Sequence, residues 1–144
     1  MGRDSAVRRV LVATDRSETA QHAEAWATEM AERYGAELLL LRVAVGGPLP
    51  PGAEDELANH ARELAGERGR AVVAAGDDPA RAIVDAAEEQ DADVVVVGNL
   101  GMGGRKEFLL GNVPNRVSHQ SRRTVVIVNT VQQVEQRKKG WLRR

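Results

Sequence analysis

The sequence predicts an α/β fold, a three-layer sandwich in which four helices cover a five-stranded parallel sheet. Short apolar runs alternate with segments whose apolar residues recur at helical spacing, which is the order of parallel strands joined by crossover helices. Aromatic residues make up only 3% of the chain while hydrophobic residues make up 42%. Aliphatic and alanine side chains must therefore build the core, as in buried parallel sheets. The length of 144 residues suits one domain.

The five strands are predicted from short runs of β-branched and aliphatic residues. The second and fourth runs are continuously apolar, which is typical of strands buried on both faces. In chain order the runs are RRVLVATD at 8–15, AELLLLRVAV at 36–45, RAVVAAG at 70–76, ADVVVVGN at 92–99 and RTVVIVNT at 123–130. We expect a Rossmann-like arrangement with strand order 3-2-1-4-5.

Four helices are predicted between these strands, because each intervening segment places its apolar residues on one face. The segments are 17–34, 53–68, 79–90 and 112–121. Ser17 fits the cap of the first helix, and Gly35 stands where that helix should end. Asp78 and Pro79 fit the cap and the first residue of the third helix.

Composition excludes several classes of function. The chain has no cysteine, which removes disulfides, thiolate zinc sites and cysteine nucleophiles. Its three histidines are scattered without metal-ligand spacing. The net charge of −1 offers nucleic acid no general attraction. No apolar stretch reaches the length of a signal peptide or membrane span. We expect a cytoplasmic protein that binds neither nucleic acid nor membrane.

A basic tail at 131–144 follows the domain at 1–130. Five basic residues stand against one glutamate in this tail, and Trp141 lies among them. A solvated terminus is one interpretation. Contact with an acidic partner, a membrane surface or nucleic acid is the other.

Ligands of open parallel sheets bind beyond the carboxyl ends of the strands. The residues there include Ala13, Thr14 and Asp15 after the first strand, and Val43 near the end of the second. Asp15 has two interpretations, as a ligand contact or as a turn-forming residue that accepts a hydrogen bond from nearby backbone.

The glycine-rich stretch after the fourth strand has the features of a phosphate site. Gly98 and Gly101 lie three apart, and Gly111 comes just before a predicted helix that begins near Asn112. Glycines let backbone approach a ligand closely, and a helix start offers unpaired N–H groups with partial positive charge. Plain tight turns are the alternative. Neither a Walker loop nor a dinucleotide fingerprint is present.

These motifs together resemble the universal stress protein family over roughly residues 6–130. The ATP-binding branch of that family has glycine, two residues, glycine, nine residues, then glycine followed by Ser or Thr. Gly98, Gly101 and Gly111 match this spacing, and VATDRSE at 12–18 matches the opening strand and acidic turn.

The resemblance implies a role for each matching position. Asp15 would lie near the adenosine or its ribose, with Ala13 and Thr14 beside it, and Val43 would make an apolar backbone contact to adenine. The phosphate end would consist of the glycines and the residues that follow them. Its members are Gly98, Asn99, Gly101, Gly111, Asn112 and Val113.

Two residues depart from the ATP-binding pattern. Asn112 stands in place of Ser or Thr, and Pro114 has neither a hydroxyl nor a backbone N–H, so a triphosphate loses donors. Asn112 is also a good helix cap. The string VGNLGM…LLGNVPNRVS resembles the actinobacterial branch that binds cyclic AMP. The expected cofactor is either ATP with magnesium or cyclic AMP. A protein that binds no cofactor is the alternative.

The resemblance therefore implies a stress-response regulatory module that binds an adenine nucleotide and is not an enzyme. One alternative is a dimeric interaction domain that has lost nucleotide binding, which Asn112 and Pro114 favour. A slow ATP hydrolase is a weaker one, because no residue is an evident base. The strand at 123–130 would be an edge strand, and the resemblance implies a homodimer formed through it. An unidentified protein partner is also expected.

Overall fold

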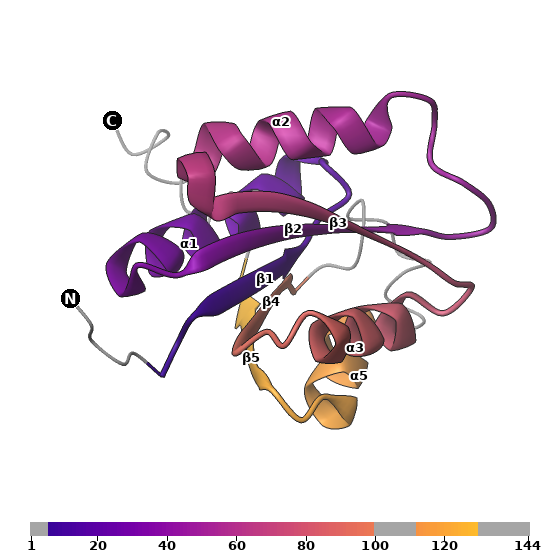
Figure 1. Ribbon diagram of the computed structural model, residues 1–144. Coiled ribbons are helices and arrows are strands. Elements are labelled where there is room, and N and C mark those ends of the chain that lie inside the picture. Colours follow the sequence, from indigo (N-terminus) through magenta and orange to yellow (C-terminus); the bar gives the residue numbers. More distant parts are fainter. Residues whose placement is uncertain (1–5, 100–111, 130–144) are drawn as a thin grey trace, which may run out of the picture.

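A five-stranded parallel sheet with the order β3-β2-β1-β4-β5 forms the centre of the molecule, as predicted (Figure 1). The computed structural model describes residues 6–99 and 112–129. The strands are β1 (Arg9–Ala13), β2 (Glu37–Ala44), β3 (Gly69–Ala75), β4 (Val94–Gly98) and β5 (Thr124–Val128). Each neighbouring pair runs parallel, so all five carboxyl ends lie at one edge of the sheet.

Helices cover both faces of the sheet, which confirms the three-layer sandwich (Figure 1). In the part of the chain that the structure describes, they are α1 (Glu18–Tyr34), α2 (Ala53–Ala65), α3 (Pro79–Glu89) and α5 (Val113–Gln120). One core cluster joins α1 and α2 to the sheet, and the other joins α3 and α5 to the opposite face.

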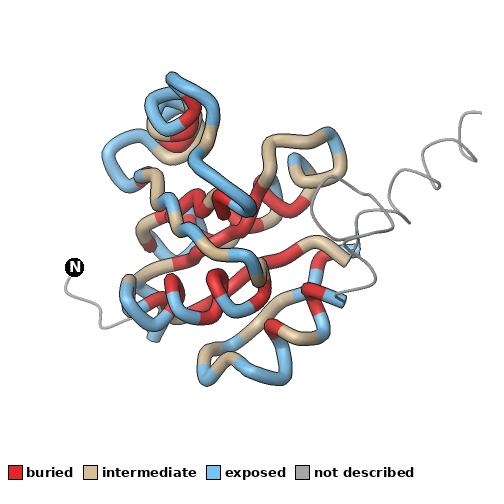
Figure 2. Tube along the Cα trace, turned by 90° about the vertical axis from the view of Figure 1, so that its right-hand side faces the viewer, coloured by how far each residue is buried: buried red, intermediate tan, exposed pale blue. Residues whose placement is uncertain are grey.

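The centre of β2 shows how one strand supplies both cores. Leu38 and Leu40 belong to the cluster under α1 and α2, while Leu39 and Leu41 belong to the cluster under α3 and α5. All four leucines have 0% exposure. Successive side chains of a strand point to opposite faces, so a continuous apolar run is what a strand covered on both sides requires. Figure 2 shows buried residues concentrated along the central strands.

Three helix ends follow the sequence signals. The Ser17 hydroxyl accepts from the Ala20 amide at 3.2 Å, and Gly35 ends α1 in the left-handed conformation. The Asp78 carboxylate accepts from the Arg81 amide at 3.4 Å with Pro79 beginning α3. These caps satisfy amides and carbonyls that the helices themselves leave without partners.

Two sequence expectations need correction. The helix expected over 53–68 ends at Ala65, and residues Gly66–Arg68 form a short 3-10 turn in which Gly66 has φ +59°. Asn112 precedes α5 as expected, but its side chain makes no capping hydrogen bond. Its φ of 49° is left-handed, whereas a capping side chain reaches the helix amides from an extended backbone.

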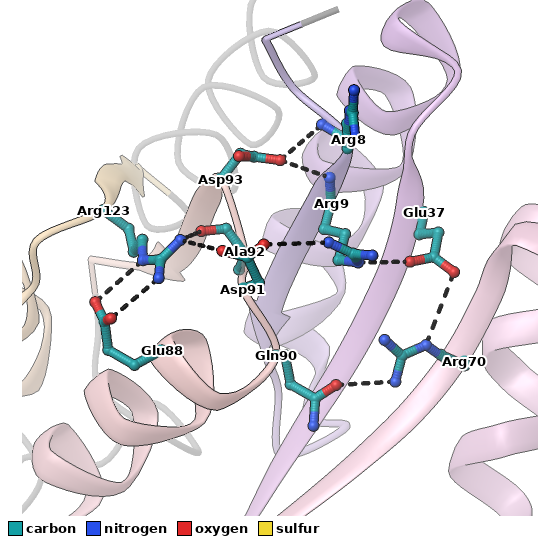
Figure 3. A network of polar contacts seen from close by, with 10 residues as sticks. All are labelled: Arg8, Arg9, Glu37, Arg70, Glu88, Gln90, Asp91, Ala92, Asp93 and Arg123. Atoms are coloured by element: carbon teal, nitrogen blue, oxygen red, sulfur yellow. Dashed lines mark hydrogen bonds and ion pairs between the residues drawn. The ribbon is translucent and has the colours of Figure 1, made fainter.

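An ion-pair network ties the strands together at the amino edge of the sheet (Figure 3). Arg9 at the start of β1 contacts Glu37 at the start of β2, with 2.9 Å between Nε and Oε1. Arg123, just before β5, donates to Glu88 at 3.0 Å and to Asp91 at 2.9 Å. These groups occupy the end of the sheet opposite to the predicted ligand site.

Candidate functional site

At the carboxyl edge of the sheet, the layer of strands has a gap beyond the end of β1, because both neighbouring strands continue past it. β1 pairs with β2 only as far as Ala13 opposite Leu41, and with β4 only as far as Val12 opposite Val96. β2 continues to Ala44 and β4 to Gly98. Adjacent strands lie about 4.8 Å apart, so β2 and β4 flank a gap of about 10 Å. This gap is the point where strand order reverses.

The backbone of Val43 faces this gap. The Leu41 carbonyl accepts a hydrogen bond from the Thr14 amide at 2.8 Å, so the backbone groups of Leu41 point toward β1. The Ala44 carbonyl accepts from the Gly76 amide at 3.2 Å, on the side of β3. Backbone groups of successive strand residues alternate in direction, so the N–H and C=O of Val43 point the same way as those of Leu41. The Val43 side chain is buried in the core under α3.

Gly98 faces the same gap from the other side. The Asn99 amide donates to the Val128 carbonyl at 2.8 Å, which directs Asn99 toward β5. By the same alternation, Gly98 directs its backbone groups toward β1. The Asn99 side chain donates to the Asn129 side chain at 3.2 Å. Gly98 and Val43 thus lie on the two sides of the gap, on β4 and β2, and the Asn99 side chain contacts the residue that follows β5.

The turn after β1 forms the floor of the gap and holds Asp15. Thr14 is 0% exposed and its hydroxyl accepts from the Arg16 amide at 3.0 Å. Oδ1 of Asp15 accepts from the Ser17 amide at 2.9 Å. Asp15 therefore acts as a turn-forming residue, which is one of the two roles that the sequence suggested for it. A carboxylate has a second oxygen, so this hydrogen bond leaves room for a ligand contact as well.

The start of α5 forms the side of the site where phosphate binding was predicted. Asn112 is exposed, whereas Val113 and Pro114 are buried. The first amides of a helix have no acceptors within it, and Pro114 carries no N–H. Backbone donors at this helix start are thus confined to Asn112, Val113 and Asn115. Gly101 and Gly111, the other two glycines of the predicted cradle, lie outside the described residues.

An ion pair between α3 and α5 holds the two helix starts together. The guanidinium of Arg116 contacts both oxygens of Asp78, at 2.9 Å and 2.7 Å. Its hydrogen bonds lower the pKa of the Asp78 carboxyl. Sequence reasoning identified Asp78 only as a helix cap. No local spacing rule pairs it with a residue 38 positions away.

Sequence reasoning also missed Glu24, a buried carboxylate of α1. Its carboxylate contacts Thr14 and Arg16 in the turn after β1 and His60 on α2. His60, one of the three scattered histidines, thus links α2 to α1. Glu24 lies on a face otherwise formed by alanines, and no repeated motif marks it.

Two properties of the described residues bear on function. No three His, Cys, Asp or Glu side chains in residues 6–99 and 112–129 gather closely enough to hold a metal ion. None of the helices in these ranges has the length and apolar character needed to cross a membrane.

Comparison with known proteins adds to this geometry. The model of the universal stress protein family matches residues 6–129. Universal stress protein YxiE of Bacillus subtilis is 31% identical to this chain over an alignment that covers 83% of this chain and 97% of that protein.

Solved structures share the architecture. A crystal structure of a universal stress protein in complex with cyclic AMP matches with a TM-score of 0.69 and 32% identity, covering 88% of this chain and 99% of that one. The structure of UspA from Lactobacillus plantarum matches with a TM-score of 0.70 at 20% identity, covering 88% and 100%. With the family model spanning the sheet and its helices, the chain belongs to the universal stress protein family.

Proposed function

We propose that this chain is a stress-response regulatory module that binds an adenine nucleotide in the gap beyond β1, without a committed catalytic step. The observation that carries the proposal is the direction of two backbones. Val43 from β2 and Gly98 from β4 both face the gap, and Asp15 lies at its floor.

The chemistry of this gap fits adenosine. A strand residue presents one N–H donor and one C=O acceptor on the same side, which complements a base edge carrying a ring nitrogen acceptor and an amino donor. Adenine has such an edge. The second carboxylate oxygen of Asp15 is an acceptor suited to a ribose hydroxyl. Gly98 has no Cβ, so its backbone allows a ligand to approach closely.

Cyclic AMP is the ligand favoured over ATP. A cyclic phosphodiester carries one negative charge, whereas a triphosphate needs many more donors, and Pro114 removes one donor from the start of α5. The similarity to a universal stress protein in complex with cyclic AMP supports this choice. ATP with magnesium is the second ligand to test.

Isothermal titration calorimetry with cyclic AMP, AMP, ATP with magnesium, and cyclic GMP tests the proposal. We expect heat with the adenine nucleotides, tightest binding of cyclic AMP, and no heat with cyclic GMP, whose base edge reverses donor and acceptor. Asp15→Asn keeps an oxygen for the Ser17 amide and removes the charge, so it should weaken binding while the fold persists. Absence of heat with every adenine nucleotide would contradict the proposal.

A second candidate function is a dimeric interaction domain that has lost its ligand and acts on an unidentified protein partner. The exposed apolar edge at β5 favours it, since Ile127 is 40% exposed. A nucleotide that binds the folded state raises the melting temperature. An unchanged melting temperature with each nucleotide, together with a stable dimer, would favour this function over nucleotide binding.

A further inference from the structure

Glu24 is a buried carboxylate that the proposed contacts to nucleotide do not use. It is 2% exposed, on the face of α1 that also carries the buried residues Ala23, Ala27 and Ala31. A buried charge is costly unless it is paired and hydrogen-bonded. What Glu24 contacts therefore indicates why the molecule keeps a carboxylate in this layer.

Glu24 holds the residues on both sides of Asp15. The Thr14 hydroxyl donates to Oε2, and NH1 of Arg16 lies 2.9 Å from each carboxylate oxygen. Arg16 has a φ of 67°, which costs a residue with a Cβ free energy. The contact between its guanidinium and Glu24 helps to fix this conformation. The contacts of Glu24 with Thr14 and Arg16 fix the backbone on both sides of Asp15, and this backbone sets the direction of the Asp15 side chain.

Glu24 also reaches the element that follows Val43. Oε1 lies 2.9 Å from Nε2 of His60 on α2. The chain passes from β2 through residues 45–52 directly into α2. The Glu24 carboxylate thus joins two segments beside the adenosine end of the gap. It contacts the turn that holds Asp15 directly, and it is connected to the end of β2 through His60 on α2. The other nitrogen of His60, Nδ1, lies 3.2 Å from the exposed Glu63.

We infer that Glu24 is a positioning residue for the adenosine half of the site, orienting Asp15 through Thr14 and Arg16 and linking the turn to α2 through His60. This inference rests on the proposed function. It goes beyond that function because it assigns the affinity for adenosine partly to a residue that touches no ligand.

The test compares Glu24→Gln with Glu29→Gln, which removes the same charge from an exposed ion pair on the same helix. Calorimetry with adenosine and with cyclic AMP, well below the melting temperature, measures binding. We expect Glu24→Gln to lower the affinity for both ligands by the same factor, about tenfold, which corresponds to the loss of one charge-assisted hydrogen bond. Equal loss places the defect in the adenosine half. Glu29→Gln should bind like the wild type.

Amide hydrogen exchange without ligand is the second measurement. In Glu24→Gln, the amides of Arg16 and Ser17 should exchange faster than in Glu29→Gln, because their turn has lost its anchor. His60→Gln, whose side chain is partly exposed, keeps Glu24 and its contacts to the turn. It provides a folded variant if Glu24→Gln does not fold. Because it removes the link from Glu24 to α2, it should weaken the binding of adenosine and of cyclic AMP by equal factors.

The outcomes separate this inference from the proposed function. Wild-type protein that binds no adenine compound overturns both. If the wild type binds and Glu24→Gln binds with the same affinity, the positioning role alone is overturned. If Glu24→Gln does not fold, the same conclusion follows from an unchanged affinity in His60→Gln. A loss for cyclic AMP with none for adenosine also overturns the positioning role. Faster exchange of the turn together with equal loss for both ligands supports it.

Discussion

Gly69 begins β3 directly beneath the last turns of α2. A Cβ placed there would lie 2.0 Å from the Ala61 carbonyl oxygen and 3.3 Å from the Ala65 Cβ. The first of these atoms is backbone, so relief requires α2 to move relative to the sheet. The absence of a side chain at this one position therefore sets how closely helix and strand approach.

We expect Gly69→Ala to lower the free energy of unfolding by about 1–3 kcal/mol, as overpacking of a close contact does. Gly76→Ala is the matched control, because its added Cβ would lie 3.8 Å from the Ala82 Cβ, an ordinary contact. It should change stability by about 0.5 kcal/mol or less. Urea denaturation measures both, and equal effects of the two substitutions would refute the argument.

Asn112 and Pro114 show how residue chemistry determines what the site can bind. The left-handed Asn112 makes no side-chain cap, and Pro114 contributes no donor in the first turn of α5. A helix start attracts anions chiefly through its unpaired amides and their partial charge. Removing one amide weakens the site most for a densely charged triphosphate.

At the scale of elements, the amino edge of the sheet is held by charges. Arg123 joins β5 to the end of α3 and to the turn before β4, and hydrogen bonds from it lower the pKa of Glu88 and Asp91 (Figure 3). The Arg123 side chain also donates to the Ala92 carbonyl at 3.1 Å. Side-chain contacts thus join β5 to α3 and β4 at the edge of the sheet opposite to the proposed site.

This network makes stability depend on pH in a defined direction. A carboxyl whose pKa is lowered by folding contributes stability above its ordinary pKa and loses it as acid protonates the folded state. The stability from these contacts is lost at pH values below the ordinary pKa of each carboxyl, which is 4.5 for Glu88 and 3.8 for Asp91. Arg123→Gln should be less stable than wild type at pH 7, and the difference should narrow as the pH falls below these values.

Urea midpoints measured across a pH series check this expectation. Arg33→Gln is the control, because it breaks an exposed pair with Glu29 on one helix and ties no elements together. Such pairs contribute little, so its midpoint should follow the wild type at every pH. A difference between Arg123→Gln and wild type that stays constant into strong acid would contradict the role given to the two carboxyls.

The sequence signals for elements succeed where the cause is local. Ser17 and Gly35 mark the ends of α1 because a hydroxyl cap and a left-handed glycine act on neighbouring backbone. The expected end of α2 at residue 68 was wrong, because the apolar pattern stops at Ala65 and Gly66, with a positive φ of +59°, ends the helix there. Local patterns thus give the existence of an element more reliably than its last turn.

At the scale of the whole molecule, the order of elements alone places Asp15, Val43 and Gly98 at one edge, so these candidate residues could be predicted. Glu24 and His60 could not, because their burial depends on a contact across 36 positions between two helices. A carboxylate in an amphipathic helix is usually a solvated charge. The same limit applies to the pair of Arg116 and Asp78.

The sheet has two edge strands, and the proposal of a homodimer through residues 123–130 concerns one of them. Each edge strand has one large apolar side chain that is exposed, Ile127 on β5 at 40% exposure and Val73 on β3 at 36%. α2 covers β3 closely, with Gly69 against Ala61. β5 pairs with β4 on one side, and α5, with eight residues, is the shortest of the described helices. Exposed apolar edges favour pairing with another chain.

We therefore expect wild-type protein to sediment as a dimer, and Ile127→Lys to shift it to monomer at the same concentration, because a lysine on an edge strand opposes strand pairing. Val73→Lys places the same charge on the opposite edge and should leave the dimer intact. Analytical ultracentrifugation over a range of concentrations measures both variants. Dissociation by Val73→Lys alone would assign the interface to β3, and a monomeric wild type would reject the dimer altogether. Either result would leave the gap beyond β1 intact, since it lies within one chain.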